Sequence, residues 1–236
     1  MIKDPEFEKT RRIWVYLPSD YSNSKNAYPV MYMFDGQNVF DNKTAFAGEW
    51  QVDEFLDRKQ KDHIIVAIAH GDEARINELT PFKTKNYGGG GGDQFLSFLI
   101  NTLKPLIDTS YRTMPDSEHT SIAGASLGGL MAFYAVIKHP DIFSVAMALS
   151  PAFWINPEIR ELLAQMEIPD HIRVYMAIGA DEVESMQKGY KDLLTILQEK
   201  AVSENQFKSE RVEGGEHNED FWSRQFEQGY NWLFPK

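Results

Sequence analysis

The chain has 236 residues, of which 42% are hydrophobic, and this is enough for one α/β domain with a sizeable core. Its formal net charge of −11 argues against nucleic acid or an anionic membrane surface as a partner. The absence of cysteine excludes disulfides, a thiol nucleophile and a cysteine-ligated metal.

Short apolar runs alternate along the chain with segments of helical character. We expect strands at residues 12–17, 30–34, 64–69, 121–125, 143–149, 173–178 and 207–212. We expect amphipathic helices at residues 52–60, 94–107, 127–138, 158–166, 187–200 and 219–232. This alternation predicts an α/β fold in which a mostly parallel central sheet carries helices on both faces. No repeat or long linker divides the chain, so residues 1–236 are expected to form one domain.

The loop after the strand at 30–34 is the first candidate for a functional role. In an open α/β sheet, ligands bind beyond the carboxyl ends of the strands. Here the chain reads Asp35-Gly36-Gln37-Asn38, and Gly36 permits an unusual backbone conformation. That conformation would leave the Gln37 N–H free to bind a developing oxyanion. An Asp-Gly pair is also an ordinary turn signal, so both interpretations stay open.

Two features between residues 70 and 92 have alternative interpretations. Arg75 suggests an anionic substrate, but acidic neighbours at 72, 73 and 78 favour a structural ion pair equally. Tyr87 precedes five consecutive glycines, Gly88–Gly92, which predict either a mobile lid over the active face or a disordered loop without a role.

The segment around Ser126 has the pattern Gly-x-Ser-x-Gly between an apolar strand and a helical stretch. Gly124 and Gly128 lack a Cβ, so a strained turn can present Ser126 while strand and helix pack closely. This is the context of a nucleophile elbow, in which the Leu127 N–H lies at a helix N-terminus and can bind an oxyanion. The alternative is a glycine-rich turn that happens to contain a serine.

Aromatic residues follow two candidate site segments. Trp50 comes after Gly48, and Phe153 and Trp154 come after the strand at 143–149. Such side chains could bind an aromatic or sugar ring of a substrate, although residues of this kind are also commonly part of the core.

A base and an acid should follow Ser126 in the order Ser, acid, His. His217 lies in a glycine-containing loop after the last strand, which makes it the candidate base, whereas His171 precedes a strand at its wrong end. The acid should follow the strand at 173–178. Glu182 is preferred for its spacing from Gly179, and Asp181 is the alternative.

These motifs together resemble one family over nearly the whole chain. They are Asp35-Gly-Gln-Asn-Val-Phe, Gly48-Glu-Trp, Arg75-Ile-Asn-Glu-Leu-Thr-Pro, Lys104-Pro-Leu-Ile-Asp, Tyr111-Arg-Thr, Gly124-Ala-Ser-Leu-Gly-Gly, Ser150-Pro-Ala-Phe-Trp and Gly215-Glu-His. The chain resembles the "putative esterase" branch of the α/β-hydrolases, which includes esterase D and the enterochelin, feruloyl and acetyl xylan esterases. It also includes the mycolyltransferases.

The resemblance implies a role for each candidate site residue. Ser126 would be the nucleophile, His217 the base and Glu182 the acid, with the backbone N–H groups of Gln37 and Leu127 as oxyanion donors. It also implies an α/β-hydrolase fold without a large cap domain. The chain departs from the family where it has His-Asn-Glu in place of His-Asp-Trp, and this difference bears on the substrate.

The expected activity is hydrolysis of a small or bulky polar carboxylic ester through an acyl-enzyme, without metal or organic cofactor. A siderophore trilactone and an acetylated or feruloylated carbohydrate are the alternative substrates. An acyltransferase on the same fold and a non-catalytic binding module are the alternative functions. With no apolar run as long as a membrane span and no hydrophobic signal region, we expect a cytoplasmic protein that does not bind membranes.

Overall fold

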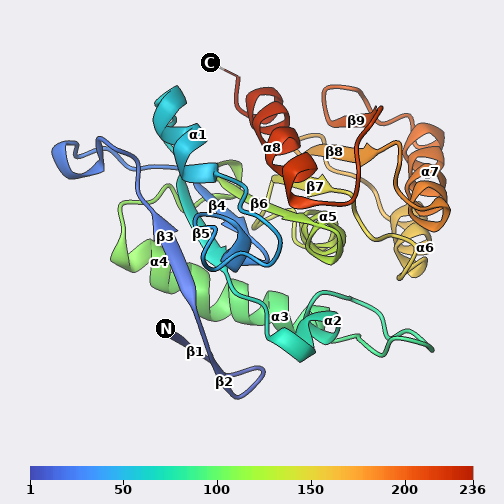
Figure 1. Cartoon of the computed structure of the whole chain (residues 1–236), viewed down its shortest axis with the longest axis horizontal. Coiled ribbons are helices and arrows are strands. Elements are labelled where there is room, and N and C mark those ends of the chain that lie inside the picture. Colours follow the sequence, from blue (N-terminus) through green and yellow to red (C-terminus); the bar gives the residue numbers. More distant parts are fainter. Residues whose placement is uncertain (236) are drawn as a thin grey trace.

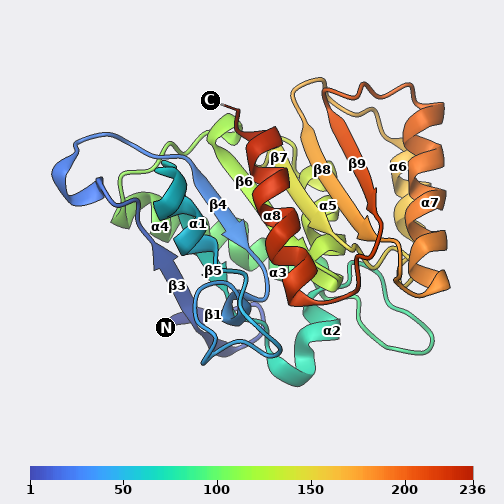
Figure 2. The same ribbon diagram turned by 45° about the horizontal axis from the view of Figure 1, so that its top comes forward.

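The computed structural model describes residues 1–235, and its centre is a seven-stranded sheet (Figure 1, Figure 2). In spatial order the strands are β3 (Ile13–Tyr16), β5 (Ile64–Ile68), β4 (Val30–Met33), β6 (Thr120–Ala125), β7 (Val145–Leu149), β8 (Arg173–Gly179) and β9 (Phe207–Val212). The edge strand β3 is antiparallel to β5, and every other neighbouring pair is parallel. The predicted strands and the mostly parallel sheet are therefore confirmed.

Helices cover both faces of this sheet. They are α1 (Val52–Lys59), α2 (Arg75–Glu78), α3 (Gly92–Phe98), α4 (Lys104–Ser110), α5 (Leu127–Lys138), α6 (Glu158–Gln165), α7 (Glu184–Glu199) and α8 (Glu219–Leu233). Figure 2 shows α1 and α8 in front of the sheet, where they bury one apolar layer. Helices α3, α5, α6 and α7 bury the other layer. Within residues 1–235, no helix is both long and apolar enough to cross a bilayer.

The predicted helix at 94–107 is interrupted. It consists of α3, a π-helical segment at Leu99–Leu103 and then α4. Pro105 lies in the first turn of α4 and has no N–H to donate to the preceding turn. The change of hydrogen-bond spacing before Pro105 lets the chain continue in the same direction.

A short hairpin at the N-terminus and helix α2 were not predicted. Strands β1 (Ile2–Asp4) and β2 (Lys9–Arg11) pair antiparallel, and their sequence is too polar to give a strand signal. The buried Arg11 guanidinium holds the hairpin, because it pairs with Asp4 at 2.6 Å and with Glu78 of α2 at 3.0 Å. Burial requires such pairing of charges, and only the tertiary structure supplies it.

The glycine run forms a turn that hydrogen bonds tie to residues 77–84. Thr84 pairs with Gly88, and the Gly90 N–H donates to the Thr80 hydroxyl at 3.0 Å. Gly89 has a φ of +84°, and a Cβ there would lie 2.1 Å from the Thr80 hydroxyl oxygen. Glycine is therefore required by close packing and by backbone conformation, which sequence pattern alone does not distinguish from a disordered loop.

A buried histidine outside the sheet is expected to make stability fall in acid. His63 is 6% exposed, accepts a hydrogen bond at Nδ1 from the Tyr230 hydroxyl and packs on Phe234. Burial lowers the pKa of His63 to about 3, so the unfolded chain binds a proton that the folded chain does not. The free energy of unfolding is unaffected by this proton above the ordinary histidine pKa, and it decreases as the pH falls from about 6.5 towards 3. At pH 4 the decrease should amount to about 3 kcal/mol.

Urea unfolding at pH 7 and pH 4 checks this prediction. The variant His63→Gln keeps an acceptor and a donor but does not titrate, so it should lose less stability than the wild type between the two pH values. His171→Gln is the control, because His171 is exposed. Equal losses in the wild type and His63→Gln would contradict the prediction.

Candidate active site

Ser126 lies in a strained turn between β6 and α5. Its backbone has φ 56° and ψ −118°, a region that few residues other than glycine adopt. The Ser126 N–H donates to the Leu149 carbonyl at 2.9 Å, which fixes the turn to β7. A Cβ at Gly124 would lie 2.5 Å from the Gly128 carbonyl carbon, so Gly124 must be glycine for strand and helix to approach. A Cβ at Gly128 would lie 3.1 Å from an Asp35 carboxylate oxygen, which is a tight contact. The sequence therefore presents the Ser126 hydroxyl at the carboxyl end of the sheet.

Two loops bring a histidine and a carboxylate to Ser126. The Ser126 Oγ lies 3.0 Å from His217 Nε2, and His217 Nδ1 lies 3.0 Å from Glu182 Oε2. The Glu182 side chain is fully buried, whereas one third of the His217 side chain is exposed. Asp181, the alternative acid, is exposed. The structure thus places Glu182, and not Asp181, against the imidazole.

Glu182 is held from the side opposite His217. Its Oε1 accepts hydrogen bonds from the Gly179 N–H at 2.9 Å and from the Ser150 hydroxyl. The Trp222 indole N–H donates to the Ser150 oxygen at 2.9 Å, and the Trp222 ring meets the His217 ring edge-on at 4.9 Å. With Oε1 occupied, Oε2 remains for the histidine.

Sequence reasoning missed Ser150 and Trp222 as functional residues. Ser150 directly follows β7 and has a positive φ of 43°. A polar residue at the carboxyl end of a central strand is a signal that could have identified Ser150. Trp222 resembles any other apolar position of α8, so only its indole contact to Ser150 distinguishes it.

The two predicted oxyanion donors lie at the start of two helical segments near Ser126. Leu127 is the first residue of α5, and Gln37 lies in a short 3₁₀ helix, Gly36–Asn38. N–H groups in the first turn of a helix have no acceptor within that helix. Gln37 and Ser126 line one cavity, and Leu127 directly follows Ser126 in the chain. The roles of Gln37 and Leu127 as oxyanion donors stay predictions.

The unusual backbone conformation in this loop is at Asp35, and the expectation for Gly36 was wrong. Asp35 is left-handed with φ 54° and ψ 46°. Gly36 is instead required by space, because a Cβ there would lie 2.5 Å from the Ala67 carbonyl carbon of β5. An aspartate tolerates the left-handed region better than most residues, and its carboxylate is fixed by an ion pair.

Arg75 forms that ion pair. Its Nε donates to one Asp35 oxygen at 2.7 Å and its Nη2 to the other at 2.8 Å. This bidentate geometry is the strong form of an arginine–carboxylate contact. Of the two alternatives for Arg75, the structure shows the ion pair, and with a residue that the sequence had not suggested.

The cavity above Ser126 has a volume of 530 Å³. Its lining residues are Asp35, Gln37, Asn38, Phe46, Ala47, Trp50, His70, Arg75, Ala125, Ser126, His217, Asn218, Glu219 and Trp222. Trp50 is 4% exposed and packs against Trp222 with ring centroids 6.2 Å apart. The cavity therefore combines an aromatic wall with charged and amide side chains, as binding sites for polar ligands do.

Phe153 and Trp154 lie elsewhere. Phe153 is 2% exposed and packs edge-on against Phe133 in the core. Trp154 is 37% exposed and meets Tyr87 edge-on, with ring centroids 5.7 Å apart. Neither residue is among those that line the cavity above Ser126.

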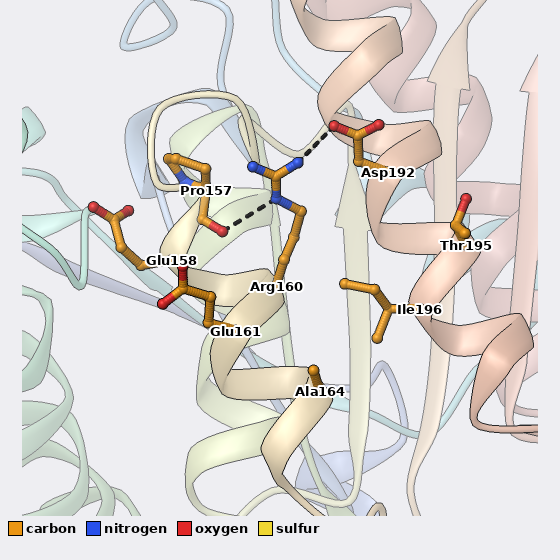
Figure 3. Close-up of a pocket in the computed structure, with 8 residues that line it drawn as sticks. All are labelled: Pro157, Glu158, Arg160, Glu161, Ala164, Asp192, Thr195 and Ile196. Carbon is orange, nitrogen blue, oxygen red and sulfur yellow. Dashed lines mark hydrogen bonds and ion pairs between the residues drawn. The ribbon is translucent and has the colours of Figure 1, made fainter.

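A second cavity, of 680 Å³, lies between α6 and α7 (Figure 3). Arg160 crosses it and donates to Asp192 at 2.6 Å and to the Pro157 carbonyl at 3.2 Å. Its wall contains no histidine, and the serine–histidine pair lies in the other cavity. The ion pair of Arg160 with Asp192 therefore links the two helices.

Known proteins resemble this chain in sequence and in structure. The "Uncharacterized protein YbbA" of Bacillus subtilis is 28% identical, over 96% of this chain and 93% of that protein. The endo-1,4-beta-xylanase/feruloyl esterase of Xylanibacter ruminicola is 26% identical over 93% of this chain, but this region is 29% of that longer protein.

A crystal structure of the enterobactin esterase FES from Shigella flexneri in the presence of enterobactin has a TM-score of 0.80. The match covers 99% of this chain and 58% of that chain at 21% identity, so it shows a shared fold. Together with the parallel sheet and its two helical layers, this confirms the predicted α/β-hydrolase fold. The family model described as "Putative esterase" matches residues 5–233, and the chain belongs to that family.

Proposed function

We propose that this protein is a serine carboxylic-ester hydrolase with Ser126 as nucleophile, His217 as general base and Glu182 as the acid that orients it. The observation that carries the proposal is the continuous contact of these three side chains, with 3.0 Å at both steps. A serine beside a base that is itself oriented by a buried carboxylate is the arrangement that nucleophilic catalysis requires. Membership of an esterase family supports the same reaction.

The proposed mechanism proceeds through an acyl-enzyme. Ser126 attacks the ester carbonyl while His217 Nε2 takes the hydroxyl proton, and Glu182 stabilises the imidazolium that forms. The N–H groups of Gln37 and Leu127 donate to the oxyanion, and His217 then gives its proton to the leaving alcohol. Water, deprotonated by the same imidazole, releases the acid. His217 moves every proton of this cycle, so the proposal includes no metal or organic cofactor.

Small-molecule esters are the proposed substrates. Relatives named for feruloyl and siderophore esters make an aromatic carbohydrate ester and a siderophore lactone the first two classes to test. The cavity of 530 Å³ lies in the size range of small-molecule sites, and Trp50 supplies an aromatic wall. An acyl acceptor other than water would use the same acyl-enzyme, so the products decide between hydrolysis and transfer.

A fluorophosphonate probe and an ester panel test the proposal together. We expect the probe to modify Ser126, identified by peptide mass spectrometry, and to abolish hydrolysis of p-nitrophenyl, feruloyl, acetyl-sugar and trilactone esters in parallel. Assays with an added alcohol measure the share of acyl groups that it captures. A folded protein that neither reacts with the probe nor hydrolyses any ester would contradict the proposal and favour a binding module.

A further inference from the structure

The charged side chains of the catalytic cavity are not balanced. Asp35, Arg75 and Glu219 are the lining residues with permanent charges. Arg75 gives two of its N–H groups to Asp35, so these two charges offset each other inside the wall. The Glu219 carboxylate then leaves the cavity with one net negative charge.

Glu219 is fixed in this position by the start of α8. Asn218 caps the helix, since its side chain accepts the Phe221 N–H at 2.9 Å, and Glu219 is the first helical residue. A carboxylate in the first turn is stabilised by the helix dipole. Glu219 is only 7% exposed, and it lines the same cavity as Ser126 and His217. Its charge therefore acts on a substrate with little screening by water.

Apart from the proposed general base His217, the remaining lining groups do not supply a compensating positive charge. His70 accepts the Asp72 N–H at Nδ1 at 2.9 Å, so a neutral His70 carries its proton at Nε2. Burial lowers the pKa of His70, and this keeps the ring uncharged at neutral pH. Arg75, the one arginine of the wall, is already paired with Asp35 and lies within electrostatic reach of Glu219.

We propose that Glu219 is a specificity-determining residue that rejects esters carrying a negative charge near the reacting carbonyl, so that the site accepts uncharged or cationic esters. This inference rests on the proposed ester hydrolysis. An anionic group would compete with Asp35 for Arg75 and would be repelled by Glu219, whereas hydroxyl or cationic groups would find an acceptor there. Glu219 is the third residue of the His-Asn-Glu sequence in which the His217 loop departs from the His-Asp-Trp of the family, so this departure supplies the negative charge.

Two pairs of isosteric esters test the proposal. The first pair is 3-carboxyphenyl acetate and 3-carbamoylphenyl acetate, with the charge on the alcohol ring. The second pair is the p-nitrophenyl esters of 4-carboxybenzoic and 4-carbamoylbenzoic acid, with the charge on the acyl ring. The measurement is the anion-to-amide ratio of kcat/KM in the wild type and in Glu219→Gln. Comparing ratios removes the intrinsic reactivity of each ester.

We expect Glu219→Gln to raise this ratio about tenfold in at least one pair, because loss of the carboxylate favours the anionic ester over its amide counterpart. Asp220→Asn is the matched control, because Asp220 is the next residue of α8 but its side chain is 75% exposed and pairs with Arg224. It should leave both ratios unchanged.

The outcomes separate this inference from the proposed function. If Glu219→Gln folds, hydrolyses the amide esters through Ser126 and shows unchanged ratios in both pairs, the role of Glu219 is wrong and ester hydrolysis stands. If Glu219→Gln does not fold, Glu219→Asp is tested in its place. This variant keeps the negative charge, so its anion-to-amide ratios should equal those of the wild type. Raised ratios in Glu219→Asp would overturn the proposal. If the wild type hydrolyses no ester, the proposed function fails first.

Discussion

Replacing Ser126 with alanine is expected to lower kcat for ester hydrolysis by about 10⁶-fold, the size of effect seen when the nucleophile of a catalytic triad is removed. The structure explains why the loss should be nearly complete. His217 Nε2 has Ser126 Oγ as its neighbour at 3.0 Å, and alanine offers it no proton to accept and no oxygen to activate. Residual activity would reflect binding and the N–H groups of Gln37 and Leu127.

The Ser126→Ala measurement needs a control for folding and for contaminating esterases. Alanine keeps a Cβ in the strained turn, so the midpoint of thermal unfolding should change little. Ser223→Ala is a matched variant, since the Ser223 hydroxyl donates to the Trp50 carbonyl beside the cavity at 2.7 Å. We expect it to keep kcat within about tenfold. Turnover by purified Ser126→Ala within tenfold of the wild type would contradict the role of Ser126.

The sheet could be predicted from the sequence because its central strands are buried on both faces. Strands such as β5 and β8 are apolar at almost every position, and that pattern depends only on local sequence. The β1–β2 hairpin could not be predicted in this way. It involves a contact of Arg11 with Glu78, a residue 67 positions later. The charged residues that weaken the strand signal in the sequence are thus paired with each other in the fold, because a buried charge needs a partner.

The residues of the site also fall into those that the sequence predicts and those that only the fold reveals. Ser126 and His217 follow from a motif with a stereochemical reason and from chain order, and the structure places them in contact. Aromatic character did not predict which side chains line the cavity. Trp50 does, whereas Phe153 packs into the core, because strand and loop geometry decides the direction of each ring.

The sequence could not decide between the two interpretations of Arg75 for a comparable reason. A single arginine near a site suggests an anionic ligand, but its partner Asp35 lies 40 residues earlier in the chain. Once that pair is formed, Glu219 decides the charge of the cavity. The substrate class therefore depends on a sum of charges from three segments, which the sequence of any one segment does not reveal.

Changing Glu182 to glutamine is expected to lower kcat by about 10⁴-fold with little loss of stability. The amide has the shape of the carboxylate, so one oxygen can still accept from the Gly179 N–H and the Ser150 hydroxyl. The other position would then present an NH₂ group to His217 Nδ1. Two donors cannot bond to each other, so Nδ1 would become the acceptor and Nε2 would carry the proton. An imidazole in that tautomer cannot accept the Ser126 proton.

Asp181→Asn decides between the two carboxylates that the sequence left open. The Asp181 side chain is exposed. The Asp181 backbone N–H donates to the Gly215 carbonyl at 3.0 Å, and the substitution keeps this bond. Its substitution should therefore leave kcat unchanged within about twofold. A loss of about 10⁴ in Asp181→Asn with an active Glu182→Gln would transfer the role to Asp181. Full activity in both variants would mean that Ser126 and His217 operate without a carboxylate partner, and the buried contact between Glu182 and His217 would then be purely structural.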